Sequence, residues 1–200
     1  MLELFQQGGP FMWPIGVCSV IALAIFLERV YVYLRISRGS DLLLREVEQL
    51  VNVNKTDEAI IVCQRAGTPL ARIFIAALRA VGRERDQIKT LVDEAGSRES
   101  APLARYLGLM ATIANISPLL GLLGTVWGMI QAFNVIAAQG VGTPATLGGG
   151  ISQALITTAA GLTVAIPTIL GHRYLSGRSE RIILEMEEYS LHLVDLLGNR

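Results

Sequence analysis

Residues 106–172 read YLGLMATIANISPLLGLLGTVWGMIQAFNVIAAQGVGTPATLGGGISQALITTAAGLTVAIPTILGH and contain no Lys, Arg, Asp or Glu. A helix needs roughly 20 predominantly apolar residues to cross a membrane. These 67 residues therefore hold two membrane spans and a short connection. The stretch also carries many hydroxyls and glycines, and unpaired hydroxyls gain nothing from lipid. We expect two membrane helices that face other helices or water.

The charged residues are segregated along the rest of the chain. Of the 17 basic residues, none lies in 1–28, 13 lie in 29–105 and four lie in 173–200. Short segments rich in Lys and Arg stay in the cytoplasm, so we expect three spans with the N-terminus outside and the C-terminus inside. Basic and acidic residues are interleaved, and this pattern gives no indication of nucleic-acid binding.

The sequence thus predicts an all-α integral membrane protein with three transmembrane helices and long helices that extend into a cytoplasmic helical domain. A retained first span fits better than a cleaved signal peptide, because Glu3 stands where a basic residue would be expected. The predicted segments are a first transmembrane helix at 11–34, a cytoplasmic helical domain at 35–105, a second transmembrane helix at 106–138, a short periplasmic turn at 139–150, a third transmembrane helix at 151–174 and a cytoplasmic amphipathic helix at 175–200.

The predicted cytoplasmic domain contains several helix boundaries. Thr56 has the character of an N-cap and Gly67 that of a stop. The pair Thr68-Pro69 restarts a helix, because proline is tolerated at the first helical position; we expect this helix to end near Gly82. Pro102 should interrupt the helix before the second span.

Small residues recur at helical spacing in both later spans. The second span places Ser117, Gly121, Thr125, Gly128 and Ala132 on one predicted face, and the third span places Ala154, Thr158, Gly161, Ala165 and Thr168 on another. Such faces let membrane helices pack closely. We expect Gly121, Gly124, Gly128, Gly161 and Ala165 to serve helix packing. The hydroxyls of Thr125 and Thr158 have two alternatives, a bond to water or a partner and a bond to their own backbone.

Other residues in or near the spans also have two interpretations. Pro118 and Pro167 predict helix kinks, either static or at a moving point. Gln153 could guard an outer entrance or cap the helix at the interface. Glu28 is a boundary charge or an ion-handling carboxylate, and the role of His172, at the inner end of the uncharged stretch, stays open.

The chain shows no sign of an enzyme. It has no phosphate-binding loop, no nucleophile motif and no paired carboxylates, and nothing predicts a metal site or another cofactor. Proteins that move cations usually carry an ionisable group inside the membrane, yet residues 106–172 contain no carboxylate. If this chain conducts protons, the proton-binding carboxylate must come from elsewhere.

Two blocks of the sequence resemble a known family. The stretch SPLLGLLGTVWGMIQAF at 117–133 and the stretch GGISQALITTAAGLTVAIP at 149–167 are similar to the signature of the MotA/TolQ/ExbB proton-channel proteins. Length and span count resemble the ExbB and TolQ members rather than the four-span MotA subunit. The resemblance implies a multi-pass energy transducer of the bacterial inner membrane.

The resemblance also implies partners and a pathway. Five copies would surround two single-span partners of the ExbD/TolR type, each carrying an intramembrane aspartate, and a TonB/TolA-like protein would be driven. Thr125 and Thr158 correspond to threonines that line the family's proton path. Relatives often carry a glutamate in place of Gln153, which weakens a direct ion-carrying role for this residue.

Several functions remain as alternatives to a proton channel that powers TonB-dependent import. They are a TolQ-like stator for envelope maintenance, a motility stator, and the use of Na⁺ in place of H⁺. A non-conducting membrane scaffold would need the small faces but not the aligned hydroxyls. A permease subunit should show a polar binding cluster on broken helices, and the sequence offers none.

Overall fold

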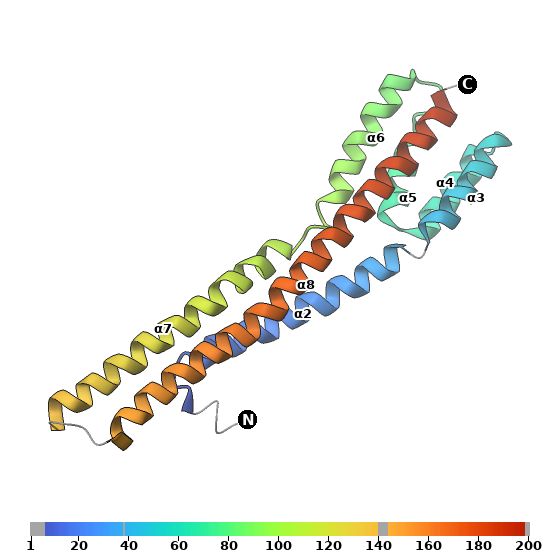
Figure 1. The fold of residues 1–200 in the computed structure, drawn as a ribbon. Coiled ribbons are helices and arrows are strands. Elements are labelled where there is room, and N and C mark those ends of the chain that lie inside the picture. The colour runs from blue at the N-terminus through green and yellow to red at the C-terminus, as the bar shows by residue number, and fades with distance from the viewer. Residues whose placement is uncertain (1–6, 38, 140–143, 199–200) are drawn as a thin grey trace. The chain divides into compact units, whose positions relative to one another are not determined.

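The computed structural model describes residues 7–37, 39–139 and 144–198, and these residues are mostly α-helical with no strand (Figure 1). The predicted all-α class is confirmed. The helices are α2 (Met12–Ser37), α3 (Ser40–Asn52), α4 (Thr56–Ala66), α5 (Pro69–Arg79), α6 (Arg85–Ser100), α7 (Leu107–Gln139) and α8 (Pro144–Gly198).

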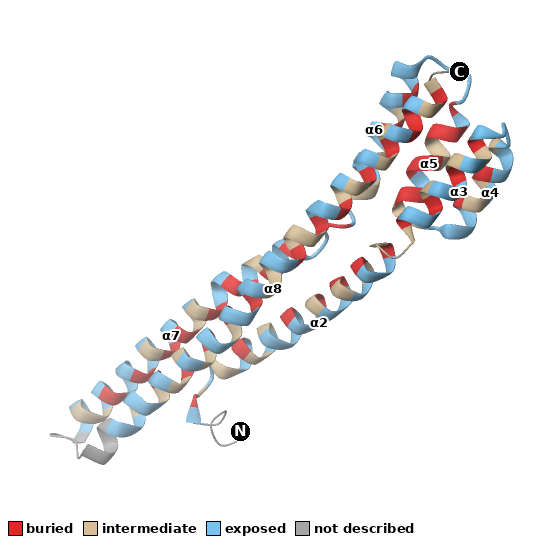
Figure 2. Ribbon diagram, turned by 45° about the vertical axis from the view of Figure 1, so that its right-hand side comes forward, coloured by how far each residue is buried: buried red, intermediate tan, exposed pale blue. Residues whose placement is uncertain are grey.

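Three of these helices, α2, α7 and α8, are long and apolar enough to cross a membrane. The mean hydropathy of their most apolar windows is 2.0, 1.6 and 1.7. Large apolar side chains on them are exposed in the single chain, among them Val20, Leu155 and Leu170. Exposed positions recur along all three helices (Figure 2). Lipid or a neighbouring protein must cover such a surface, because a soluble monomer rarely exposes one.

The chain divides into two compact units. The first comprises Met1–Glu28 and Tyr106–Tyr174, and the second comprises Arg29–Arg105 and Leu175–Arg200. Helices α2 and α8 therefore each contribute residues to both units. The first unit contains the whole uncharged stretch, and the second contains α3 to α6 with the last part of α8.

The second unit is built around α5, whose Leu70, Ile73 and Phe74 side chains are almost fully buried. Its start follows the predicted boundary, because the Thr68 hydroxyl oxygen accepts a hydrogen bond from the Ala71 amide at 3.2 Å and Pro69 is the first helical residue.

Three other boundaries were predicted in this unit, and the structure agrees with them to different degrees. Gly67 ends α4 with φ of 60°, as predicted. The prediction for Thr56 was wrong, since Lys55 is the N-cap residue of α4 and no side chain caps this end. The following helix, α5, ends at Arg79, one turn before the predicted end at Gly82.

The chain leaves the helical path between α6 and α7, where Pro102 was predicted to interrupt it. Helix α6 ends at Ser100, and Tyr106 just before α7 has φ of +65°. The irregular segment is held by α2, because Arg29 Nη1 donates to the Pro102 carbonyl at 3.0 Å and the Tyr33 hydroxyl donates to the Leu103 carbonyl at 2.7 Å. The Tyr33 bond gives the Leu103 carbonyl a partner, and the Arg29 bond adds a side-chain donor to the Pro102 carbonyl, which also accepts from the Arg105 amide at 3.3 Å.

The connection between α7 and α8 is shorter than the predicted turn at 139–150. Helix α8 begins at Pro144, so the glycines at 148–150 are helical. Glycine costs about 1 kcal/mol in a helix relative to alanine, but at Gly150 it also permits close contact, because an added Cβ would lie 2.8 Å from the Gly128 carbonyl oxygen. Helix α8 then continues unbroken to Gly198, and the predicted third span and C-terminal helix are one helix.

Candidate ion pathway

Helices α7 and α8 meet along a line of small buried residues in the first unit, which we call the α7–α8 seam. The seam residues are Ser117, Gly121, Gly124, Gly128 and Ala132 on α7 and Ala154, Thr157 and Gly161 on α8. Ala165, which was also predicted to serve helix packing, is buried on α8. Their small size lets the two backbones approach each other closely.

The glycines of the seam leave no room for a side chain. A Cβ added at Gly161 would lie 2.5 Å from the Ser117 carbonyl oxygen, and one added at Gly121 would lie 3.0 Å from the Thr157 carbonyl oxygen. A Cβ at Gly124 would lie 2.5 Å from the Thr157 hydroxyl oxygen. That helix association depends on these glycines remains a prediction.

The seam differs from the predicted faces at its threonines. On α7, Gly124 is buried at the contact while the neighbouring Thr125 is only half-buried; on α8, Thr157 is fully buried and Thr158 is half-buried. Adjacent residues point about 100° apart on a helix, which has 3.6 residues per turn. The spacing of small residues in the sequence could therefore not tell which of two adjacent residues lies at the centre of the α7–α8 contact.

The hydroxyl of Thr158 donates a hydrogen bond to the Gly121 carbonyl of α7 at 3.2 Å. That carbonyl is one helical turn before Thr125, whose own hydroxyl donates to the Leu122 carbonyl at 2.6 Å. The two predicted pathway threonines are thus linked through one turn of α7. Each hydroxyl hydrogen is engaged by a backbone carbonyl, so the hydroxyl oxygen offers its lone pairs as acceptors.

Gln153 lines a cavity of about 280 Å³ in the first unit. A second amide side chain, Gln131 of α7, lines the same cavity together with Trp127. The Trp127 ring meets Phe11 edge-to-face at 6.2 Å. Sequence reasoning missed Gln131, although it is the next long polar side chain on α7 after Thr125 and could have been paired with Gln153.

The two predicted kink positions lie inside α7 and α8, and both helices continue past them. Proline has no amide hydrogen, so Pro118 leaves the Ala114 carbonyl and Pro167 leaves the Thr163 carbonyl without the usual helical donor. Bending and movement at these positions remain predictions.

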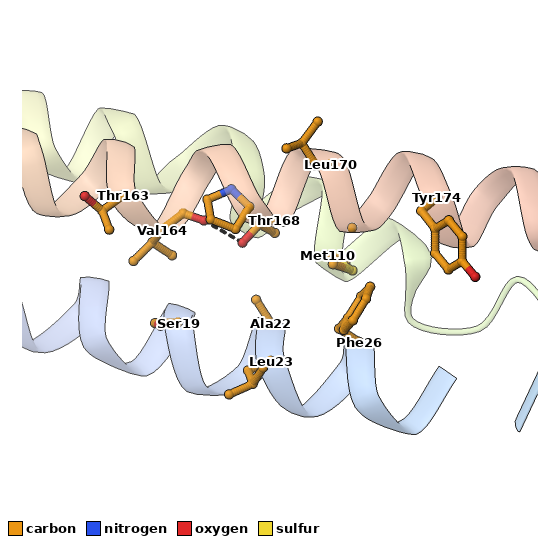
Figure 3. Close-up of a pocket in the computed structure, with 12 residues that line it drawn as sticks. Ser19, Ala22, Leu23, Phe26, Met110, Thr163, Val164, Thr168, Leu170 and Tyr174 are labelled. Carbon is orange, nitrogen blue, oxygen red and sulfur yellow. Dashed lines mark hydrogen bonds between the residues drawn. The ribbon is translucent and has the colours of Figure 1, made fainter. Parts of the chain in front are cut away.

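A second, largely apolar cavity of about 570 Å³ lies between α2, α7 and α8 and includes Pro167 in its wall (Figure 3). Ala22 of α2 points toward α8 near Val164 and Thr168, and Phe26 of α2 points toward Met110 of α7 (Figure 3). The Thr168 hydroxyl donates to the Val164 carbonyl at 2.7 Å, so its hydrogen already has an acceptor within the helix. Within the described part of the chain, no cluster of three or more His, Cys, Asp or Glu could hold a metal ion.

Comparison with known proteins decides the family. A sequence model described as the MotA/TolQ/ExbB proton channel family matches residues 65–188. The chain belongs to this family. The resemblance drawn from the two sequence blocks is confirmed, and the match extends over α5, α6, α7 and most of α8.

Relatives with both ExbB and TolQ names match the chain. The biopolymer transport protein exbB1 of Vibrio cholerae is 30% identical over 97% of this chain and 86% of its own length. An ExbB-like protein of Synechocystis, ExbB-like 3, is 34% identical over 82% of this chain and 80% of its own length. The Tol-Pal system protein TolQ of Pseudomonas aeruginosa is 44% identical over 44% of this chain and 38% of its own length.

Membership fixes the broad function and the location. The chain is a channel-family subunit and a multi-pass protein of the inner membrane, with three helices able to span the bilayer. The roles of Thr125, Thr158 and Gln153 are not decided by membership.

Proposed function

We propose that this chain forms a ring of five copies around two single-span ExbD/TolR-like partners and conducts protons with them. The observation that carries the proposal is the bond between the Thr158 hydroxyl and the Gly121 carbonyl, next to Thr125, in a stretch without any carboxylate. Two oxygen acceptors are thus held in a membrane helix pair that has no acid of its own.

The proposed pathway joins these acceptors to an aspartate on the partner helix. An ionised carboxylate at the centre of a bilayer costs about 2.5–3.5 kcal/mol on insertion scales, so protonation favours its entry. The protonated acid then carries an O–H donor, for which the Thr125 and Thr158 oxygens are suitable acceptors. Ionised and neutral acid therefore prefer different positions against the ring.

The cavity lined by Gln131 and Gln153 provides a polar route at one end of the seam. Under the proposed topology this end faces the periplasm, so protons enter there and leave toward the cytoplasm. An amide neither gains nor loses a proton near neutral pH; these residues would orient water rather than carry the ion.

The mismatch between five ring subunits and two partners makes the positions of the two partner acids inequivalent. Two acids cannot occupy equivalent positions in a fivefold ring, so each protonation changes which contacts are favourable. We infer that this rotates the partner pair within the ring and drives a TonB/TolA-like protein. We take TonB-dependent import as the first candidate, because relatives over most of this chain are named biopolymer transport proteins, and envelope maintenance as the second, because a Tol-Pal system protein also matches.

Proton flux into proteoliposomes tests the requirement for a partner acid. We expect the complex of this chain with its single-span partner to acidify the lumen under an imposed voltage. The chain alone and the complex whose partner aspartate is changed to asparagine should remain at the leak rate. Proton flux through the chain alone would contradict the inference that the partner supplies the proton-binding carboxylate. Absence of flux from the complete complex would favour a non-conducting membrane scaffold. A repeat with Na⁺ as the only permeant cation separates the two ions.

The machine that is driven can be identified by complementation. The chain and its partner would be introduced into cells lacking either ExbB and ExbD or TolQ and TolR. Restored growth on an iron-siderophore source supports TonB-dependent import, whereas restored detergent resistance alone supports envelope maintenance.

A further inference from the structure

A groove with a basic rim lies between α5 and α6 in the second unit. It has a volume of about 420 Å³. Small or apolar side chains line its floor and arginines stand on its rim. We define this basic groove by Ala76, Ala80, Leu91 and Ala95 on the floor and Arg72, Arg79, Arg83 and Arg98 on the rim.

Only part of the positive charge is neutralised inside the chain. Arg72 pairs with Glu99 at 2.8 Å and Arg98 pairs with Glu94 at 2.6 Å, and both glutamates also line the groove. Arg79 and Arg83 are exposed, and no ion pair is formed by either of them within residues 7–37, 39–139 and 144–198. The groove therefore keeps two positive charges beside an apolar floor.

Helix α8 carries a surface of the opposite character in the same unit. Its exposed side presents an acidic stripe, defined by Glu180, Leu184 and Glu188. Leu184 is 62% exposed although it is a large apolar residue. The stripe thus combines acidic groups with an uncovered apolar side chain, as a complement to the basic groove would require.

The acidic stripe cannot fill the groove of its own chain. The opposite side of α8 is buried through Ile182, Met186 and Leu193, which fixes the stripe on the outward side. Helix α6 lies beside α8 at a separate cavity, which is lined by Val92 and Gly96 of α6 and by Glu187 and Leu191 of α8 but not by Glu180, Leu184 or Glu188. The partner that fits the groove is therefore a stripe from another molecule.

We propose that the acidic stripe of one copy of this chain docks in the basic groove of the next copy. The lengths are similar, because Arg72 to Arg79 spans seven residues and Glu180 to Glu188 spans eight, or about 10 Å and about 12 Å along a helix. Leu184 of the stripe covers the alanine-rich floor, while its glutamates face Arg79 and Arg83. The contact joins two different surfaces, and a head-to-tail contact of this kind closes into a ring when the rotation between copies divides the full circle.

This inference rests on the ring assembly proposed above and names the cytoplasmic surfaces that hold it. The charged pairs lie at the rim of the contact and remain accessible to salt, so the contact weakens as ionic strength rises. The leucine and alanine contacts are insensitive to screening, so salt should weaken the contact only in part.

Charge reversal and rescue test the contact in the full-length protein. Arg79→Glu with Arg83→Glu should raise the concentration at which half of the detergent-solubilised protein is assembled by about tenfold, the size expected for two exposed ion pairs lost. Adding Glu180→Arg and Glu188→Arg in the same chain should restore assembly. Arg65→Glu changes the same charge at an exposed arginine of α4 outside the groove and should have no effect.

A direct test uses two differently tagged copies expressed together, one with Arg83→Cys and one with Glu188→Cys. A short bismaleimide should link the two tags, whereas Arg65→Cys paired with Glu188→Cys should give no link. Wild-type rings without this link, or charge-reversed protein that assembles like the wild type, would overturn the contact and leave the ring standing. Wild-type protein that stays monomeric would overturn both the contact and the proposed assembly.

Discussion

Replacement of Gly161 by alanine gives a quantitative test of the α7–α8 seam. An added Cβ would lie 2.5 Å from the Ser117 carbonyl oxygen, and ordinary contact begins near 3.4 Å. The obstacle is backbone and cannot rotate away, so the two helices must separate by about 0.9 Å. A radial gap of about 0.5–1 Å forfeits a quarter to a half of the dispersion energy of the contacts that it opens.

The separation also removes a hydrogen bond. The Thr158 hydroxyl lies 3.2 Å from the Gly121 carbonyl oxygen, and a further 0.9 Å takes the pair beyond hydrogen-bonding distance. Overpacking costs about 1–3 kcal/mol and the lost bond about 0.5–1.5 kcal/mol, while alanine in place of glycine gains about 1 kcal/mol of helix propensity. The net loss is about 2 kcal/mol, which lowers Tm by about 4–8 °C at this chain length.

Thermal unfolding in detergent measures this loss, with Gly177→Ala as the matched control. Gly177 lies in the same helix, and a Cβ there would meet nothing within 4 Å. We expect Gly177→Ala to unfold at or slightly above the wild-type temperature and Gly161→Ala to unfold below it. Equal or higher stability of Gly161→Ala would refute the close approach of α7 and α8 at this position.

Three further predictions concern the second unit. Burial raises the pKa of the Cys63 thiol to about 12, so maleimide at pH 8 should label it only after unfolding, as mass spectrometry would show. A hydrogen bond to Asp41 raises the pKa of Tyr189 to about 12. The stability that this bond contributes is complete below about pH 10 and is lost as pH rises through 12. In an ultraviolet titration, Tyr189→Phe should therefore lack the tyrosinate signal with the highest midpoint. Thr68→Ala removes the N-cap of α5 and should cost about 1 kcal/mol in chemical unfolding, against little change for Thr90→Ala on the exposed side of α6; equal losses would contradict the capping role.

The sequence predicted the elements of the fold well, because their signals are local. Absence of charge marked the uncharged spans, and Gly67 and Thr68 marked a helix end and the next start through their own backbone chemistry. The start of α8 was misjudged, because three consecutive glycines normally favour a turn. Here Gly150 is helical and lies against Gly128, a tertiary contact that local propensity does not contain.

The candidate site was predicted less completely than the fold. Thr158 and Gly121 were both named, but the hydrogen bond between them depends on the rotation of α8 about its axis. The same rotation buries Thr157, which the spacing did not single out. Gln131 was missed because its meeting with Gln153 requires two segments 22 residues apart to line one cavity.

In the proposed pathway, the Thr158 and Thr125 hydroxyl oxygens accept a hydrogen bond from the protonated aspartate of the partner helix. The most direct test is proton flux through the reconstituted complex carrying Thr158→Val or Thr125→Val. Thr163→Val serves as a control for β-branched substitution, because Thr163 is an exposed threonine of the same span whose hydroxyl donates to the Ala159 carbonyl.

Loss of an acceptor for a buried donor costs about 1–3 kcal/mol, so we expect flux to fall about tenfold or more in Thr158→Val and in Thr125→Val, with Thr163→Val near the wild-type rate. Wild-type flux in both pathway variants, in complexes that assemble normally, would contradict the account.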